Sequence, residues 1–226
     1  TMTNEVFLAQ FRNWIPEMRA IARRRPGTGA CAVASAMSLW LWTLEHLREA
    51  TDANGRPLYH DQRQGLTFAM VDALCWLLAS RHQILDVIEL EDRGPENPNL
   101  TDALPGIVGF FTDLCHVQAA RGAGEVGRIC AELVFGYNRH PSWDDDQACA
   151  DVPVTSVTEF QSEEIDAESA EDPLKAGPCV NLKGFGAFLQ MRTKLDGCLT
   201  GARLAKDRAA QALTEVMIPE ALDYPL

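Results

Sequence analysis

The sequence predicts an all-α protein, an up-and-down antiparallel bundle of about five long helices with one long acidic loop. Three observations support this fold class. Apolar residues recur every three or four positions along most of the chain, which is the spacing of amphipathic helices. Clusters of Pro, Gly and Asn interrupt that spacing, and no segment alternates like a strand. The chain has 226 residues, 46% of them hydrophobic, which is enough for one domain over 1–226.

The helices are expected over residues 4–25, 28–50, 60–90, 101–137 and 184–218. Pro26 and Gly27 end the first helix, and Pro219 ends the last one. Apolar side chains surround almost the whole of 28–50, so we expect this second helix to be mostly buried.

The helix over 101–137 is expected to be the buried spine of the bundle. It carries a run of small residues: Ala119, Ala120, Gly122, Ala123, Gly124 and Gly127. Each glycine inside a helix costs roughly 1 kcal/mol relative to alanine, so the run indicates close approach of another helix. Gly197 and Gly201 lie four residues apart in the last helix, and we expect them to form the opposite side of that contact.

The charge of the chain argues against nucleic acid as a partner. The formal net charge is −12, whereas binding to phosphates needs a basic surface. Residues 138–180 hold eleven acidic and two basic side chains without a helical period. We expect them to form a mobile surface loop, with a docking tail for a basic partner as the alternative.

The cysteines and apolar segments predict a cytoplasmic protein without membrane spans. Among the seven cysteines, five lie in apolar helical runs: Cys31, Cys75, Cys115, Cys130 and Cys198. We interpret these five as free, buried thiols in a reducing compartment. The longest apolar run, 31–44, is too short to cross a bilayer. The acidic N-terminus lacks the apolar core of a secretory signal.

Four charged residues of the spine helix, Arg121, Glu125, Arg128 and Glu132, are the candidate ligand-binding residues. They follow one another at spacings of four, three and four, and we call them the charge ladder. On an exposed flank such residues pair with each other. If the ladder is buried, it forms a network with the last helix or holds a phosphate or carboxylate of a ligand.

Asp113 and His116, one turn apart on the same helix, are the candidate catalytic residues. A carboxylate can orient an imidazole for proton transfer, although a satisfied structural pair is the simpler interpretation. We expect no metal site, because no histidine has a glutamate three residues before it. The aromatic residues Trp14, Trp40, Trp42, Trp76, Phe68, Phe110 and Phe111 line either the core or an apolar ligand cavity.

Two segments resemble the C-terminal helical region of acyl-CoA dehydrogenases. The sequence AELVFGY at 131–137 is similar to the Gln-x-x-Gly-Gly-x-Gly-Tyr helix end of that family, without the Gln and with one of the glycines. The segment 205–220 resembles the closing helix of its longer members. The two segments cover under a quarter of the chain. No catalytic glutamate is carried over by a matching motif.

The resemblance implies an accessory or dimerising helical domain or subunit that associates with a flavoprotein or with a second copy of itself. FAD is then expected only together with a partner chain. Whether the protein is an enzyme stays open. If it is one, the resemblance implies an oxidoreductase component. The alternative function is a helical bundle that binds an apolar, possibly anionic, small molecule.

Overall fold

The computed structural model describes residues 4–51, 55–59, 63–100, 102–136 and 185–217, and its fold is all-α. The α-helices are α1 (Glu5–Arg24), α2 (Ala30–Glu49), α3 (Gln64–Arg93), α4 (Leu104–Phe135), α6 (Phe185–Gly197) and α7 (Ala202–Met217), and a 3-10 helix, η1 (Gly94–Glu96), follows α3. The fold class predicted from the sequence is confirmed. The predicted acidic loop over 138–180, with Trp143, Cys149 and Cys179, lies outside the described residues.

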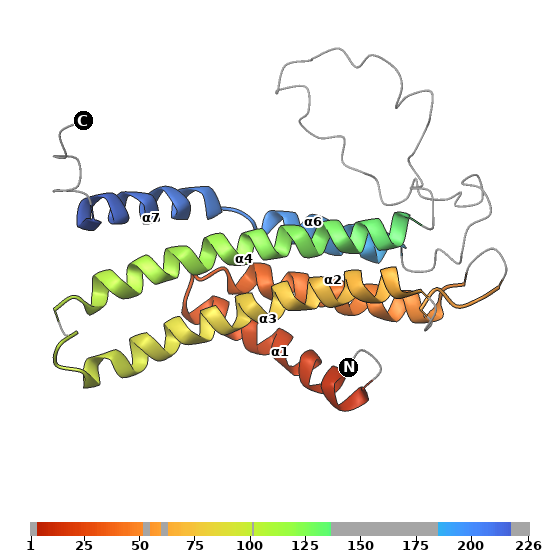
Figure 1. Ribbon diagram of the computed structural model, residues 1–226, viewed down its shortest axis with the longest axis horizontal. Helices are drawn as coiled ribbons and strands as arrows, with labels where there is room; N and C mark the ends of the chain where they lie inside the picture. The colour runs from red at the N-terminus through yellow and green to blue at the C-terminus, as the bar shows by residue number, and fades with distance from the viewer. Residues whose placement is uncertain (1–3, 52–54, 60–62, 101, 137–184, 218–226) are drawn as a thin grey trace, which may run out of the picture.

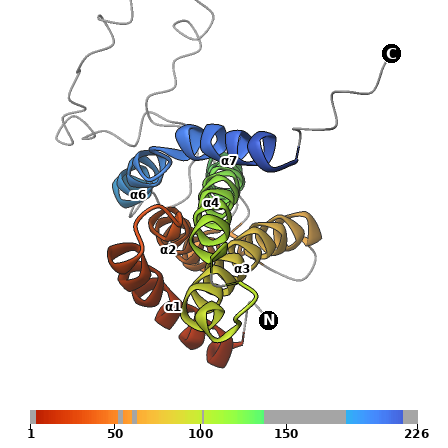
Figure 2. The same ribbon diagram turned by 90° about the vertical axis from the view of Figure 1, so that its left-hand side faces the viewer.

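From α1 to α6, successive α-helices run in opposite directions along the molecule, which is compatible with the predicted up-and-down order (Figure 1). α7 instead continues in the direction of α6. In the end-on view, α4 lies between α6 and α7 on one side and the first three helices on the other (Figure 2). α4 packs against α2, α3, α6 and α7, whereas α1 packs mainly against α2. The prediction that this helix is the central spine of the bundle is therefore confirmed.

The second helix is buried on most sides, as its apolar sequence predicts. Val33, Met37, Trp40 and Leu44 are fully or almost fully buried. The indole Nε1 of Trp40 donates a hydrogen bond to the Met70 carbonyl at 2.9 Å, so its polar atom is satisfied within the core. α2 and α4 together hold the bundle around one hydrophobic core.

The glycines of α4 give two helices close access to its backbone. A Cβ placed on Gly122 would lie 2.9 Å from the Ser80 Oγ of α3, and one on Gly127 would lie 2.5 Å from the Arg192 Nη1 of α6. Gly124, by contrast, faces open space. The predicted close approach is confirmed at two of the three glycines, but the α3 contact was not expected.

The last predicted helix is two helices, and this corrects the sequence interpretation. α6 ends at Gly197 and α7 begins at Ala202. Gly201 lies in the turn between them with a φ of 83°, a left-handed conformation that glycine adopts without strain. A Cβ on Gly197 would meet nothing within 4 Å, so this residue does not form the predicted contact with the spine.

Candidate functional site

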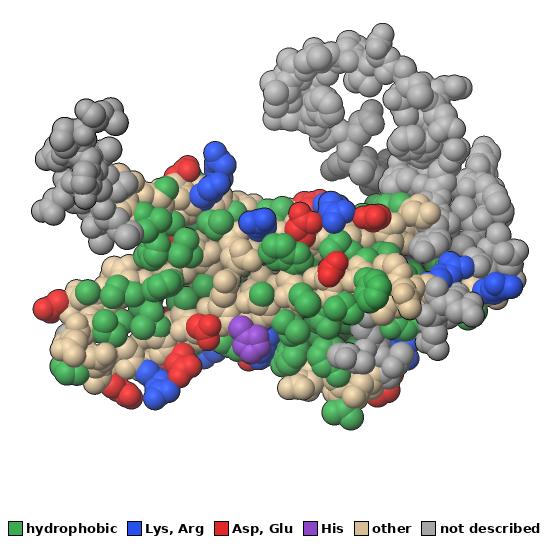
Figure 3. Space-filling view, in the orientation of Figure 1, with side chains coloured by type: hydrophobic (Ala, Val, Ile, Leu, Met, Phe, Trp, Pro, Cys, Tyr) green, Lys and Arg blue, Asp and Glu red, His purple; other side chains and the backbone are tan. Residues whose placement is uncertain are grey.

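A groove between α3 and α4 forms a cavity on the described surface. We call it the α3–α4 groove. It has a volume of about 340 Å³ and is lined by Gln83, Asp86, Val87, Leu90, Phe111, Leu114 and Cys115. Phe111 and Leu114 remain 43% and 37% exposed. Figure 3 shows hydrophobic side chains gathered at the end of the molecule where α3, α4 and α7 run.

The spacing of residues along the two helices explains how the groove forms. Its α3 residues recur at three- and four-residue intervals and therefore share one face, and the same holds for its α4 residues. Beyond the groove the two helices come close, because Gly94 leaves room for Leu104. A Cβ on Gly94 would lie 2.5 Å from a methyl carbon of Leu104. The missing side chain thus allows η1 to close this end of the hairpin.

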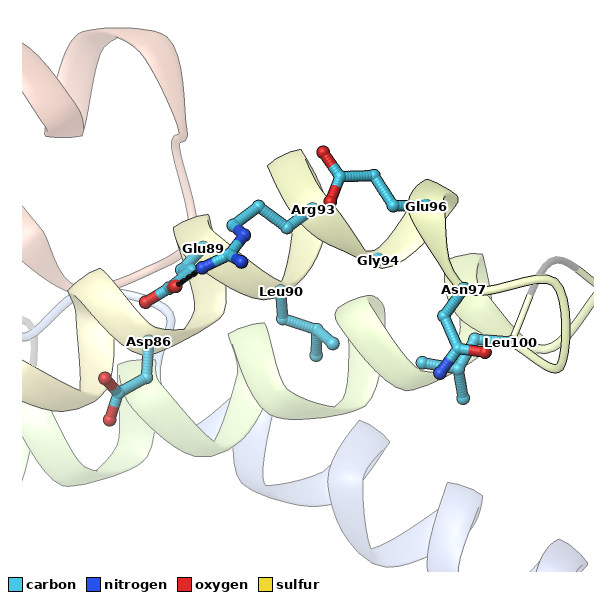
Figure 4. Close-up of a pocket in the computed structure, with 8 residues that line it drawn as sticks. All are labelled: Asp86, Glu89, Leu90, Arg93, Gly94, Glu96, Asn97 and Leu100. Atoms are coloured by element: carbon cyan, nitrogen blue, oxygen red, sulfur yellow. Dashed lines mark hydrogen bonds and ion pairs between the residues drawn. The ribbon is translucent and has the colours of Figure 1, made fainter.

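A second, more open cavity of about 450 Å³ continues from the groove along the end of α3. Asp86 and Leu90 line both cavities, and Figure 4 shows the remaining lining residues around η1. Arg93 lies here but donates to Glu89 at 2.6 Å. Within the described part of the chain, Asp86 and Glu96 form no ion pair. The edge of this surface therefore carries negative charge that its own cation does not neutralise.

Cys115 forms part of the floor of the α3–α4 groove, and its thiol is unreactive. Burial, and next the nearby Asp86 carboxylate, raise the pKa of this thiol to about 11. Its Sγ donates a hydrogen bond to the Gln83 carbonyl at 3.3 Å. Because the thiolate is the nucleophile, Cys115 is protonated and unreactive near neutral pH. The groove is thus suited to binding and not to covalent chemistry at this residue.

The candidate catalytic pair lies elsewhere, where α7 crosses α4. The carboxylate of Asp113 accepts hydrogen bonds from both the Nε and the Nη2 of Arg208, the first at 3.0 Å. Burial is the main cause that lowers the pKa of His116, and a hydrogen bond to the Thr200 backbone partly opposes it. A catalytic role for Asp113 and His116 stays a prediction. Their contacts favour a structural role that fastens α7 and its preceding turn to α4.

The charge ladder lies on the surface, and three of its four residues form ion pairs with one another. The Arg128 side chain is 61% exposed, and its guanidinium contacts Glu125 at 3.1 Å and Glu132 at 2.9 Å. Arg121 instead lies over the Trp76 ring, with 5.5 Å from its Cζ to the ring centroid. The surface alternative is therefore the one observed, and ligand binding by these four residues stays a prediction.

The aromatic residues are divided among separate contacts instead of surrounding one cavity in the described structure. Trp14 contacts Phe7 and Phe11, while Trp42 stacks on His46 at 5.0 Å. Phe68 is 62% exposed on α3. The pKa of His46 is lowered mainly by burial, and its Nε2 is buried without a hydrogen-bond partner among the described residues.

Sequence reasoning missed the α3–α4 groove and Arg208. The groove requires the relative rotation of two helices, which the sequence of neither helix specifies. A signal was present, because Phe111 and Leu114 are apolar residues three apart, outside the small-residue run of α4. Arg208 carried no signal, since it lies 95 residues from Asp113.

No protein-family model, curated protein or solved structure matches the chain. None of the described helices is both long enough and apolar enough to cross a membrane. Among the described residues, no group of three or more His, Cys, Asp or Glu side chains is placed to hold a metal ion.

Proposed function

We propose that this protein acts by association, as a helical docking domain whose α3–α4 groove receives an amphipathic helix of a partner protein. The observation that carries the proposal is the apolar groove itself, floored by Val87, Leu90 and Cys115 and flanked by the exposed Phe111 and Leu114. Binding of an apolar helix face in such a groove is a recurring mode of peptide recognition. Exposed apolar side chains that adjoin a cavity are typical of interaction sites.

The charge around the groove supports a partner helix with basic flanks. Asp86 lies at the junction of the two cavities, and Glu96 lies farther along the same edge. Arg25 is engaged by Glu91 and Asp92, as Arg93 is by Glu89. The net charge of −12 adds a long-range attraction for a basic segment. The resemblance to acyl-CoA dehydrogenases makes a flavoprotein the first natural partner to test.

The test uses a synthetic amphipathic peptide with Leu and Phe on one face and Lys at its flanks. Its binding is measured by fluorescence anisotropy against wild type, Leu114→Asp and Phe68→Asp. Phe68 is the matched control because it is also an exposed apolar residue, on α3 outside the groove. We expect Leu114→Asp to weaken binding about tenfold or more, and Phe68→Asp to leave it unchanged.

Two outcomes would contradict the proposal. Equal loss of binding in both variants would mean that the peptide does not use the groove. Equally tight binding of a peptide with Glu flanks would remove the role of the acidic edge. Analytical ultracentrifugation of the protein alone adds a further outcome. If Leu114→Asp dissociates a dimer, the occupant of the groove is a second copy of the chain and not another protein.

A small apolar molecule is the second candidate occupant. The cavity volume of about 340 Å³ lies at the lower end of ligand pockets. The acidic edge favours a neutral or cationic compound over the anionic ligand considered from the sequence. Thermal shifts with a neutral and an anionic apolar dye, compared between wild type and Leu114→Trp, distinguish this candidate. A ligand pocket predicts a shift with the neutral dye that is lost when the tryptophan fills the cavity.

A further inference from the structure

Two cysteines far apart in sequence meet where the turn between α6 and α7 crosses the start of α2. The Sγ atoms of Cys31 and Cys198 are 3.3 Å apart. The Ser35 Oγ lies one helical turn beyond Cys31 and is also 3.3 Å from the Cys198 Sγ. Cys31 is exposed, which corrects the expectation that it is buried, and Cys198 is half-buried. Cys75 is also exposed, against the same expectation.

The surroundings hold both thiols in place. Cys31 is the second residue of α2, which is a rigid element, and Gly29 seats the start of that helix on α4. A Cβ on Gly29 would lie 2.5 Å from the Ala119 Cβ and 3.2 Å from the His116 Cα. The Cys198 N–H donates to the carbonyls of Lys194 and Leu195 at 3.1 and 3.0 Å. Both cysteine backbones are therefore fixed before any bond forms between their side chains.

We propose that Cys31 and Cys198 form a reversible disulfide site, oxidised by small soluble disulfides of the glutathione class. The bond requires the two sulfurs to approach from 3.3 Å to about 2.04 Å. Oxidation ties the α6–α7 turn to the first turn of α2.

The exposure of the two thiols assigns the order of the reaction. The Cys31 thiolate attacks one sulfur of the small disulfide, forms a mixed disulfide and releases the first small thiolate. The Cys198 thiolate then attacks the Cys31 sulfur and displaces the second one. The two protein thiols lose two electrons and two protons, and the small disulfide becomes two thiols. Ser35 is a positioning residue, because its hydroxyl is placed to donate to the Cys198 sulfur during that attack.

Neighbouring groups shift the pKa of Cys31, the nucleophile of the first step, in both directions. Burial, followed by the contact with Cys198, raises the pKa of the Cys31 thiol, while Lys194 and Arg19 lower it. By comparison, burial raises the pKa of Cys130 to about 12, and this thiol is shielded in the core. Cys31 and Cys198 therefore combine access to solvent with a partner thiol at contact distance.

The test incubates the full chain in buffers with graded ratios of oxidised to reduced glutathione, followed by alkylation. The expected product migrates faster on a non-reducing gel, because the bond closes a loop between residues 167 apart. Tryptic digestion is expected to give peptide 25–48 joined to peptide 195–203, each of which contains one cysteine. Mass spectrometry identifies this linked pair.

Matched variants separate this site from general thiol oxidation. Cys31→Ser and Cys198→Ser are expected to lose the faster band completely, whereas Cys75→Ser retains it. Ser35→Ala is expected to retain the final bond but to form it more slowly. The proposal is overturned if wild type stops at glutathione on Cys31, if the linked peptides contain other cysteines, or if Cys198→Ser still gives the faster band.

Discussion

The guanidinium of Arg208 in α7 donates two hydrogen bonds to the carboxylate of Asp113 in α4, and this ion pair joins helices far apart in sequence. The Asp113 side chain is 15% exposed while Arg208 is 58% exposed. Among the α7 residues whose side chains are described, 202–214, the buried ones are the small Ala205 and Ala209. The ion pair is therefore a specific polar contact between α7 and the bundle.

Replacing Arg208 by Met should loosen α7 without unfolding the bundle. Asp113 would lose both hydrogen bonds, and the remaining alanine contacts bury little area. We expect faster amide hydrogen exchange in α7 and in the turn before it, with unchanged exchange in α2. Arg203→Met, on an exposed position of the same helix, is the control. Equal effects of the two variants would show that the ion pair does not hold α7 in place.

Alanine at Gly122 and at Gly124 should have different effects on stability. Both variants gain helix propensity, roughly 1 kcal/mol each. Only the new methyl group at Gly122 meets a buried neighbour, the Ser80 Oγ at 2.9 Å, whereas that at Gly124 enters open space. We expect Gly124→Ala to be the more stable variant by about 1–3 kcal/mol in urea unfolding. Equal stabilities would argue against close packing of α3 on α4.

The two lowered histidine pKa values predict that stability falls on mild acidification. Burial favours the neutral imidazole of His46 and of His116, so both pKa values lie below the usual 6.5 in the folded state. The unfolded chain binds protons first as the pH falls through 6.5, so their contribution is complete above that pH and is lost below it.

Urea unfolding between pH 7.5 and 5.5 measures this effect above the range where most carboxylates titrate. Replacing both histidines by Gln should flatten the dependence of the unfolding free energy on pH. His82→Gln, at an exposed position of α3, is the control. An unchanged slope in the double variant would assign the pH dependence to other groups.

Two arginine variants should separate the surface charge ladder from a buried cation. Arg128→Met removes a side chain that is 61% exposed, so the urea midpoint is expected to stay within experimental error. The Arg81 side chain is 11% exposed, pairs with Glu17 at 2.9 Å and lies 4.5 Å over the Trp14 ring. Arg81→Met should cost about 1–2 kcal/mol. A large loss of stability in Arg128→Met would favour the interpretation of the charge ladder as a buried network.

The sequence was sufficient to predict the helices, because their apolar periods act over one or two turns. α3, for example, begins four residues after the predicted start and ends three residues after the predicted end. The break between α6 and α7 was missed since the apolar period continues across it. The structure shows the turn by the end of α6 at Gly197, the start of α7 at Ala202 and the positive φ of Gly201.

The candidate sites could be predicted only where they depend on one helix. The pairing of Arg128 with Glu125 and Glu132 follows from spacing within α4. The contacts of Asp113 with Arg208, and of Cys31 with Cys198, depend on how helices slide and rotate against each other. That geometry results from packing of the whole core, which no local pattern contains. The α3–α4 groove belongs to the same class.

Because the buried side chains described in α7 are the small Ala205 and Ala209, its attachment responds to ionic strength through the Asp113–Arg208 pair. An exposed guanidinium loses much of its attraction for a carboxylate when the Debye length shrinks from about 10 Å at 0.1 M salt to about 3 Å at 1 M. The remaining bundle depends less on salt, because the leucine, methionine and tryptophan side chains of its core hold its helices together in addition to their ion pairs. Concentrated salt should therefore release α7 while the rest of the protein stays folded. Detachment of α7 and unfolding of the remaining bundle would then be two separate transitions.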